Sequence, residues 1–226
     1  MNRLRTVFFD LDGTLLDTAP DMAFTLNQLM LQHGLAEIPY NNIRATVSDG
    51  AKAMVSLGFK LDHSDPAFSA LVDEFLTLYE KHATNATRPF QDMEMVLQFL
   101  DDHRLPWGIV TNKPSRFTFD ILKSLDLEHR AACIVCGDTL TKRKPDPEPI
   151  LHACHLLQKN PDECVYVGDS RFDVQASQSA GMPALVALYG YIKKEEDPFA
   201  WRADGYIRDA KEIISWLEKN PVAAVK

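Results

Sequence analysis

From Pro89 onward, the chain alternates between two patterns of hydrophobic positions. Stripes of apolar residues at helical spacing, such as Met93, Val96 and Leu100, are separated by short apolar or β-branched runs. Such alternation is typical of a parallel sheet flanked by helices. We therefore predict an α/β fold, with helical stripes at residues 93–100, 117–125, 150–157 and 210–217 and strands at residues 107–111, 132–136, 164–168 and 184–188.

The segment between residues 16 and 88 has a different pattern. Met22, Leu26 and Met30 recur at helical spacing, a second helical stripe covers residues 68–79, and no run is typical of a strand. We therefore predict a helical insertion between the first and second strands. The predicted domains are an α/β core of residues 1–15 and 89–226 and a helical cap of residues 16–88.

The first apolar run, residues 6–9, ends in two carboxylates, Asp10 and Asp12, before a Gly13-Thr14 turn. Residues i and i+2 of a strand share a face, so both carboxylates would project from its carboxyl end, where open α/β sheets bind ligands. Such a pair is tolerable if a cation lies between the two or one holds a proton. A divalent metal would make Asp10 a ligand and a nucleophile, and a protonated Asp12 could act as general acid. The simpler interpretation is a turn that uses Asp and Gly for backbone reasons.

Three further polar clusters lie near predicted strand ends. Thr111-Asn112-Lys113 and Gly168-Asp169 with Asp173 each follow an apolar run, and Lys144-Pro145 precedes a helical pattern. Taken singly, Thr111-Asn112 could cap a helix, and Lys144 could belong to a solvated basic loop. Their order along the chain and their placement favour a functional site instead.

Together, Asp10-x-Asp12-Gly-Thr, Thr111-Asn112, Lys144-Pro145 and Gly168-Asp169 with Asp173 resemble the haloacid dehalogenase superfamily over essentially the whole chain. The resemblance implies a doubly wound, Rossmann-like parallel sheet with an inserted α-helical cap. The second Asp of the first motif, at position 12, resembles the phosphotransfer branch of the superfamily and is not expected in true dehalogenases.

The resemblance also implies a role for each of these residues. Asp10 would attack phosphorus to form an aspartyl phosphate, and Asp12 would protonate the leaving oxygen and then activate water. Lys144 would neutralise charge on the transferring group. Asp10, the backbone carbonyl of Asp12 and Asp169 would hold Mg²⁺, with Asp173 in support. The expected phosphate-binding residues are Thr111, Asn112 and Lys113.

Substrate selection is expected to reside in the cap, which would close over the site. The candidate segment is residues 43–55, where Arg44 and Ser48 are four positions apart and would share a helical face. Gly50 would let a substrate approach the backbone closely. We expect Arg44 to receive a substrate carboxylate.

Longer stretches narrow the resemblance. The cap position and Thr111-Asn112-Lys113-Pro114 resemble the phosphoglycolate phosphatase-like branch. Arg44 with residues 48–55, and Tyr189-Gly190-Tyr191-Ile192, resemble the N-acetylmuramic acid 6-phosphate phosphatases of bacterial peptidoglycan recycling. This resemblance predicts hydrolysis of N-acetylmuramic acid 6-phosphate. The alternatives are a 2-phosphoglycolate phosphatase, a sugar phosphomutase and a noncatalytic binding protein that has kept the fold.

Composition restricts the possible partners. The net charge of -8 argues against nonspecific nucleic-acid binding, and no apolar run reaches the roughly 20 residues of a membrane helix. Residues 1–5 lack the apolar stretch of a signal peptide, and the four cysteines fit free thiols in a reducing compartment. We expect a cytoplasmic monomer or weak homodimer whose partner is a small-molecule phosphate ester, with no nucleic acid and no membrane.

Overall fold

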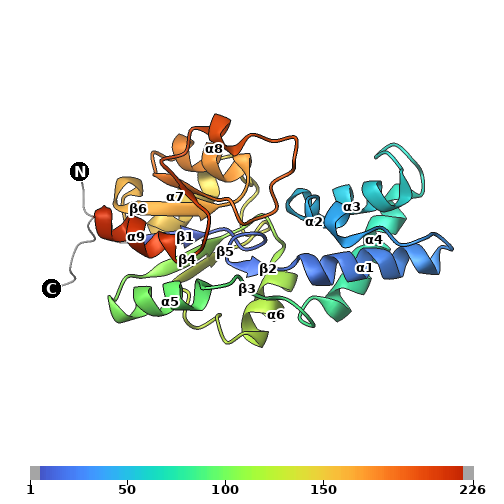
Figure 1. Cartoon of the computed structure of the whole chain (residues 1–226), viewed down its shortest axis with the longest axis horizontal. Helices are drawn as coiled ribbons and strands as arrows, with labels where there is room; N and C mark the ends of the chain where they lie inside the picture. The colour runs from blue at the N-terminus through green and yellow to red at the C-terminus, as the bar shows by residue number, and fades with distance from the viewer. Residues whose placement is uncertain (1–5, 221–226) are drawn as a thin grey trace.

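The protein has a six-stranded parallel sheet with helices on both faces and a group of helices at one end (Figure 1). The computed structural model describes residues 6–220, so residues 1–5 and 221–226 of the predicted core lie outside the described part. The strand order is β5-β4-β1-β6-β7-β8, and every neighbouring pair is parallel. The strands are β1 (Thr6–Phe9), β4 (Trp107–Val110), β5 (Cys133–Val135), β6 (Cys164–Gly168), β7 (Ala184–Ala187) and β8 (Gly205–Ile207).

Helices cover both faces because the strands bury side chains on both faces. Val7 and Phe9 of β1 belong to one apolar cluster, which includes residues of α5, α6 and α9. Phe8 belongs to a second cluster, with Ile150 of α7 and Ala176 of α8. The predicted doubly wound α/β fold is therefore confirmed. The flanking helices are α5 (Met93–Asp102), α6 (Ser115–Ser124), α7 (Glu148–Leu156), α8 (Arg171–Ser179) and α9 (Glu212–Lys219), with 3₁₀ helices η2 (Pro161–Glu163) and η3 (Pro198–Trp201).

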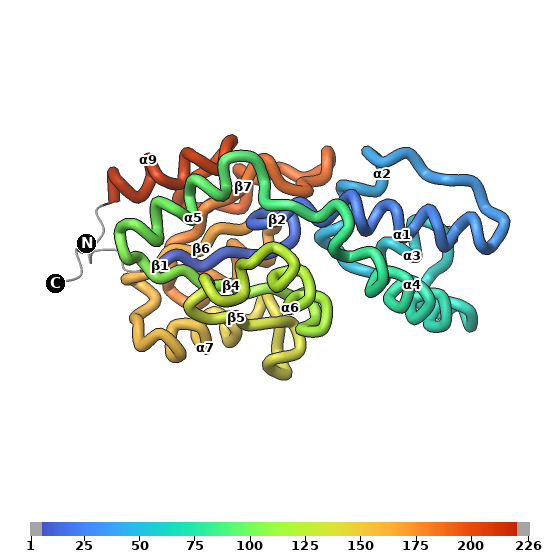
Figure 2. The backbone as a smooth tube through the Cα atoms, turned by 90° about the horizontal axis from the view of Figure 1, so that it is seen from below, coloured from blue at the N-terminus to red at the C-terminus, as the bar shows by residue number. Residues whose placement is uncertain are grey.

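The helical cap lies beyond the carboxyl edge of the sheet, and the chain enters and leaves it along a two-stranded antiparallel ribbon (Figure 2). In this ribbon Leu16 pairs with Pro89 and Asp17 with Arg88. The apolar cluster of β1 continues through the ribbon into the cap, where Leu26 and Phe75 are fully buried. The elements are β2 (Leu16–Asp17), α1 (Ala19–Gln32), α2 (Tyr40–Arg44), η1 (Val47–Asp49), α3 (Gly50–Phe59), α4 (Phe68–His82) and β3 (Arg88–Pro89).

Most predicted elements of the core are present, and the differences have local causes. The four predicted strands correspond to β4, β5, β6 and β7. The expectation of no strand between residues 16 and 88 is wrong, because the two residues of β2 pair with β3. The pattern also misses α8, which is polar along most of its length, and the three-residue edge strand β8. All four cysteines are free, as expected, and no described helix is long and apolar enough to cross a membrane.

A buried carboxylate fastens the cap to the ribbon. Asp21, in the first turn of α1, is 2% exposed. Its oxygens accept hydrogen bonds from the backbone of Ala86 at 2.9 and 3.0 Å, the backbone of Thr87 at 2.8 Å and the Thr87 hydroxyl at 2.8 Å. The start of α1 is thereby tied to the segment that leads back into the core, which fixes where the cap begins.

We predict that Asp21→Ala lowers the free energy of unfolding by about 2–4 kcal/mol, because three donors lose a charged acceptor and two of them are backbone groups. Urea denaturation followed by circular dichroism would measure this. The control is Asp73→Ala, which removes an exposed carboxylate of α4 and should change stability by less than about 0.5 kcal/mol. Equal stability of the two variants would contradict the fastening role.

Candidate active site

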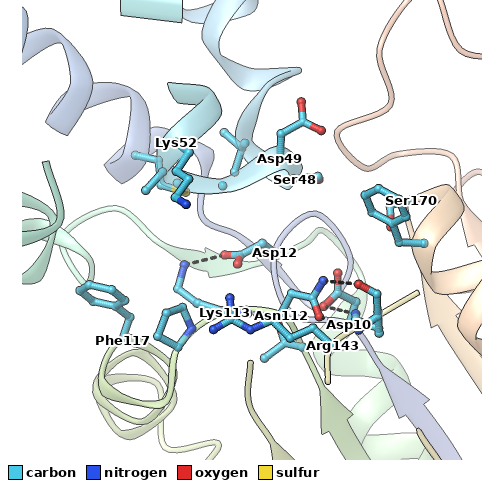
Figure 3. Close-up of a pocket in the computed structure, with 18 of the residues that line it drawn as sticks. Asp10, Asp12, Ser48, Asp49, Lys52, Asn112, Lys113, Phe117, Arg143 and Ser170 are labelled. Carbon is cyan, nitrogen blue, oxygen red and sulfur yellow. Dashed lines mark hydrogen bonds and ion pairs between the residues drawn. The ribbon is translucent and has the colours of Figure 1, made fainter. Parts of the chain in front are cut away.

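Polar side chains from four loops meet at the carboxyl edge of the sheet. Asp10 follows β1, Thr111 follows β4 and Asp169 follows β6, and these strands are neighbours. Lys144 comes from the loop between β5 and α7. The chain order reverses at β1, so this edge is the topological switch point at which α/β sheets bind ligands. A cavity of about 440 Å³ lies here, between the sheet and the cap (Figure 3).

Most of the predicted site residues line this cavity. The exceptions are Asp169, which lies beside it, and Arg44. The predicted residues in its wall are Asp10, Asp12, Ser48, Gly50, Thr111, Asn112, Lys113, Lys144 and Asp173.

Three carboxylates crowd the floor of the site. Asp10, Asp169 and Asp173 each place one oxygen within 4.8 Å of the others. Burial raises the pKa of Asp10 to about 6, although Lys144 opposes this shift. Burial and the charges of Asp10 and Asp173 raise the pKa of Asp169 well above its usual range. Asp169 Oδ1 is buried and accepts no hydrogen bond from the described residues. This set of oxygen ligands fits a hard divalent cation, which would offset the repulsion.

Lys144 is the cation that this cluster already holds. Its Nζ lies 2.9 Å from Asp10 Oδ1 and 2.7 Å from Asp173 Oδ1, and it donates a hydrogen bond to the Tyr166 hydroxyl at 2.7 Å. Burial alone would lower the pKa of Lys144, but the two carboxylates outweigh burial and raise it. The ammonium group therefore stays charged and points at the oxygen atoms of the first motif.

Asn112 positions Lys144 rather than facing the cavity with its amide. The Asn112 side chain donates to the backbone carbonyl of Lys144 at 2.9 Å and accepts from its backbone N–H at 3.0 Å. Thr111 is 4% exposed, and its hydroxyl oxygen accepts a hydrogen bond from the backbone of Lys113 at 3.2 Å. The Thr111 hydroxyl therefore keeps its own proton available to a phosphate oxygen.

Asp12 and Lys113 form a second ion pair on the cap side of the cavity. Lys113 Nζ lies 2.9 Å from Asp12 Oδ1 and donates to the Tyr79 hydroxyl of α4 at 3.0 Å. Burial alone would lower the pKa of Lys113, but Asp12 and Tyr79 hold it above its usual value. The Thr18 hydroxyl also donates to Asp12 Oδ1, at 2.5 Å. The predicted phosphate-binding Lys113 is thus committed to Asp12 in this structure.

Asp169 sits where only glycine allows such close packing. A Cβ on Gly13, whose φ is +83°, would lie 2.1 Å from Asp169 Oδ2, and one on Gly190 would lie 2.3 Å from Asp169 Cβ. Asp169 Oδ2 accepts hydrogen bonds from the backbone of Tyr191 at 2.8 Å and from the Ser48 hydroxyl at 3.2 Å. The cap residue Ser48 is therefore in direct contact with one of the three clustered carboxylates.

The structure places Arg44 away from the cavity. Its guanidinium donates to the carbonyls of Tyr189 and Gly190 at 2.9 Å each and lies 4.8 Å from the centre of the Tyr191 ring. The expectation that Arg44 and Ser48 share one helical face is wrong, because α2 ends at Arg44 and Ser48 belongs to η1. Arg44 thus joins the cap to a loop of the core.

Gly50 leaves free space in the part of the cavity wall that the cap provides. It has φ +81° and lines the cavity, and an added Cβ would meet nothing within 4 Å. The positive φ, rather than crowding, is the feature that favours glycine at this position.

Several residues that complete the site carry no clear signal in the sequence. Tyr166 is buried in β6 and reads as part of an apolar run, yet its hydroxyl donates to the Val110 carbonyl at 2.6 Å and receives Lys144. Ser170 binds Asp173 through a reciprocal pair of hydrogen bonds at the start of α8, which the Ser170-x-x-Asp173 spacing could have indicated. Tyr79 and Lys52 give no signal beyond helical spacing.

Comparison with known proteins identifies the class. Residues 7–187 match the family described as haloacid dehalogenase-like hydrolase. The chain belongs to this family, which confirms the resemblance to the haloacid dehalogenase superfamily that its motifs indicated.

The relatives are phosphatases. N-acetylmuramic acid 6-phosphate phosphatase from Pseudomonas aeruginosa is 38% identical over 217 residues, 96% of each chain. Phosphoglycolate phosphatase from Xylella fastidiosa is 44% identical over 201 residues, 88% of this chain and 87% of that one. The crystal structure of a predicted phosphoglycolate phosphatase from Haemophilus somnus shares the fold, with a TM-score of 0.84 and 24% identity, covering 96% of this chain and 99% of that chain. The protein is therefore a phosphomonoester hydrolase.

We predict that saturating Mg²⁺ raises the melting temperature by about 5–10 °C, because an ion present at about 100 times its Kd adds about 2.7 kcal/mol to stability. The shift should be smaller at about pH 5 than at about pH 8, because protonation of Asp10, whose pKa is about 6, competes with the cation. Differential scanning fluorimetry would measure both shifts.

Asp169→Asn should lose most of this shift. The control is Asp120→Asn, an exposed carboxylate of α6, which should keep it. A shift of the same size in Asp169→Asn would remove Asp169 from the cation site.

Proposed function

We propose that the protein is a Mg²⁺-dependent phosphatase that works through an aspartyl phosphate on Asp10. The observation that carries this proposal is the position of Asp10 at the centre of the switch point, with Lys144 on one side and the cluster of Asp169 and Asp173 beside it. Asp10, the backbone carbonyl of Asp12 and Asp169 would hold the ion, with Asp173 in support. When bound, the ion supplies positive charge that stabilises the transferring phosphoryl group.

In the first step, an oxygen of Asp10 forms a bond to phosphorus while the bond to the leaving oxygen breaks. Lys144 lies against the same carboxylate and neutralises charge on the phosphoryl oxygens. Thr111 offers its hydroxyl proton to one of these oxygens. Asn112 contributes by holding Lys144 in place through its backbone.

Asp12 is proposed to act on the leaving oxygen and then on water. It gives a proton to the leaving oxygen in the first step and takes one from the attacking water in the second. Lys113 lies 2.9 Å from Asp12 Oδ1 and holds this carboxyl group at the cap side of the cavity. Because Tyr79 of the cap also binds Lys113, closing the cap orders this pair and excludes water from the first step.

N-acetylmuramic acid 6-phosphate is the proposed substrate, which would place the enzyme in peptidoglycan recycling, as a cytoplasmic monomer or weak homodimer. A cavity of about 440 Å³ falls within the range of about 300–1,000 Å³ that suits drug-sized ligands and exceeds what a two-carbon acid requires. Apolar side chains of the cap and of α6 form one wall, which suits the faces of a sugar ring. These side chains are Met22, Val72, Phe75, Leu76 and Phe117.

2-Phosphoglycolate is the second candidate, because relatives named phosphoglycolate phosphatase match the chain at 42–44% identity. A sugar phosphomutase shares the same expected motifs but would retain the phosphoryl group. The division of the chain into a core of residues 1–15 and 89–226 and a cap of residues 16–88 is part of the proposal, since the cap supplies much of the wall that would contact the leaving group.

The covalent mechanism predicts a clear difference between two variants. Asp10→Asn keeps the shape but removes the nucleophile, so phosphate release from p-nitrophenyl phosphate with excess Mg²⁺ should fall to near background. Asp12→Asn keeps its backbone carbonyl and should lose only acid–base assistance, about 10²–10⁴-fold. Steady-state assays on both variants would measure this. Appreciable turnover by Asp10→Asn would exclude the mechanism.

The substrate assignment is tested with a panel of phosphate esters at equal concentration. We predict that kcat/KM for N-acetylmuramic acid 6-phosphate exceeds that for 2-phosphoglycolate by about tenfold or more, because the larger ligand gains contacts with the cap wall. Release of inorganic phosphate, rather than an isomeric sugar phosphate, would separate hydrolysis from mutase activity. The reverse order of the two substrates would favour the phosphoglycolate assignment.

A further inference from the structure

The charged side chains on the floor of the cavity are nearly all paired with one another. Lys144 binds Asp10 and Asp173, and Lys113 binds Asp12. These cations are committed to the phosphoryl site and to Asp12. A second anionic group on a substrate must therefore find its partner elsewhere in the wall.

Two polar side chains of the cap are also engaged, but with the core. Arg44 donates to the carbonyls of Tyr189 and Gly190, and Asp49 pairs with Lys193 at 2.5 Å. Both contacts join the cap to the segment after β7. The guanidinium of Arg44 is therefore hydrogen-bonded outside the cavity, and another residue must bind a substrate carboxylate.

Lys52 is the cap cation that remains available. It lies in the first turn of α3, lines the cavity and is exposed. Among residues 6–220 it has no ion pair or side-chain hydrogen bond, and α3 has no acidic residue in its first turn that could neutralise it. Figure 3 shows Lys52 extending from the cap into the space above Asp12.

Arg143 is the other exposed cation of the wall, but it belongs to the core side. It directly precedes Lys144 in the chain and interacts electrostatically with Asp138. A substrate whose phosphate lies against Lys144 extends its leaving group toward Asp12, since Asp12 must reach the leaving oxygen. Lys52 belongs to the cap, above Asp12 (Figure 3), whereas Arg143 belongs to the core loop that carries Lys144.

We propose that Lys52 determines specificity by binding the carboxylate of the substrate's leaving group, which in the proposed substrate is the lactyl carboxylate. The inference rests on the proposed substrate and mechanism, and in it Lys52 replaces Arg44 as the expected receptor of the carboxylate. An ammonium group on a flexible stem adapts to a carboxylate several bonds from the phosphate.

The test compares two sugar phosphates that differ only in the lactyl group: N-acetylmuramic acid 6-phosphate and N-acetylglucosamine 6-phosphate. Lys52→Gln should lower kcat/KM for the first by about 10- to 100-fold, mainly by raising KM. It should change the value for the second, and for p-nitrophenyl phosphate, by less than about twofold, because neither carries a carboxylate. Lys52→Arg should restore most of the activity on the first substrate.

The control is Lys81→Gln, which removes an exposed lysine of α4 outside the cavity and should leave all three substrates unchanged. Unchanged activity of Lys52→Gln on the muramic acid derivative, or equal losses on both sugar phosphates, would overturn the role of Lys52 while leaving the phosphatase function intact. A wild-type enzyme that hydrolyses p-nitrophenyl phosphate but not the muramic acid derivative would overturn the substrate and this inference together.

Discussion

Three carboxylates, the buried Asp169 and Asp173 and the partly exposed Asp10, lie together at the carboxyl edge of the sheet. Lys144 is the cation that holds two of them, Asp10 and Asp173, in place. Removing one partner of a buried ion pair typically costs about 3–5 kcal/mol, because a charge is left uncompensated. Neighbouring residues hold Lys144 and its partner in position. Asn112 hydrogen-bonds to the Lys144 backbone, the Tyr166 hydroxyl accepts a hydrogen bond from the Lys144 ammonium group, and the Ser170 hydroxyl donates to Asp173. The remaining negative charge makes the edge of the sheet a place for a divalent cation and a phosphate.

The cap is joined to this edge in two ways. At the β2–β3 ribbon the apolar core is continuous and Asp21 is fully hydrogen-bonded, so the base of the cap is fixed. Nearer the cavity, polar contacts also join the two parts: Arg44 with two carbonyls, Ser48 with Asp169, and Tyr79 with Lys113. The Tyr79 ring also packs against the Phe117 ring of α6, 5.2 Å away. Each such contact contributes about 0.5–1.5 kcal/mol or somewhat more. A cap that moves away from the sheet would break these few contacts and keep the apolar base.

The sequence predicts what depends on local order along the chain. The alternation of strands and helices predicts the parallel sheet. Because parallel strands share a carboxyl edge, the polar motifs that follow the strands are predicted to meet there, and they bring together Asp10, Thr111, Lys144 and Asp169. It does not predict contacts that depend on how the cap docks. From the sequence, Arg44 is the expected receptor for a carboxylate, but in the structure its guanidinium donates hydrogen bonds to the carbonyls of Tyr189 and Gly190.

In the core, the hydrophobic pattern misses α8 and the role of Tyr166, because polar groups are buried there. In α8 the buried face is formed by Val174, Ala176 and Ser177 together with Asp173, so it carries no strong apolar stripe. Tyr166 looks apolar in a strand, and its hydroxyl gains a role only because Lys144 arrives from a distant loop. Such polar partners of buried residues are set by tertiary structure and not by spacing along the chain.

The most direct test of the account is to trap the covalent intermediate. Rapid acid quench of Asp12→Asn during turnover with Mg²⁺, followed by peptide mass spectrometry, should find a phosphoryl group on the peptide that contains Asp10. This variant is expected to slow hydrolysis of the intermediate, so the modified fraction should exceed that in the wild-type enzyme. A phosphoryl group on another residue, or phosphate release with no modified Asp10 peptide in either protein, would contradict the account.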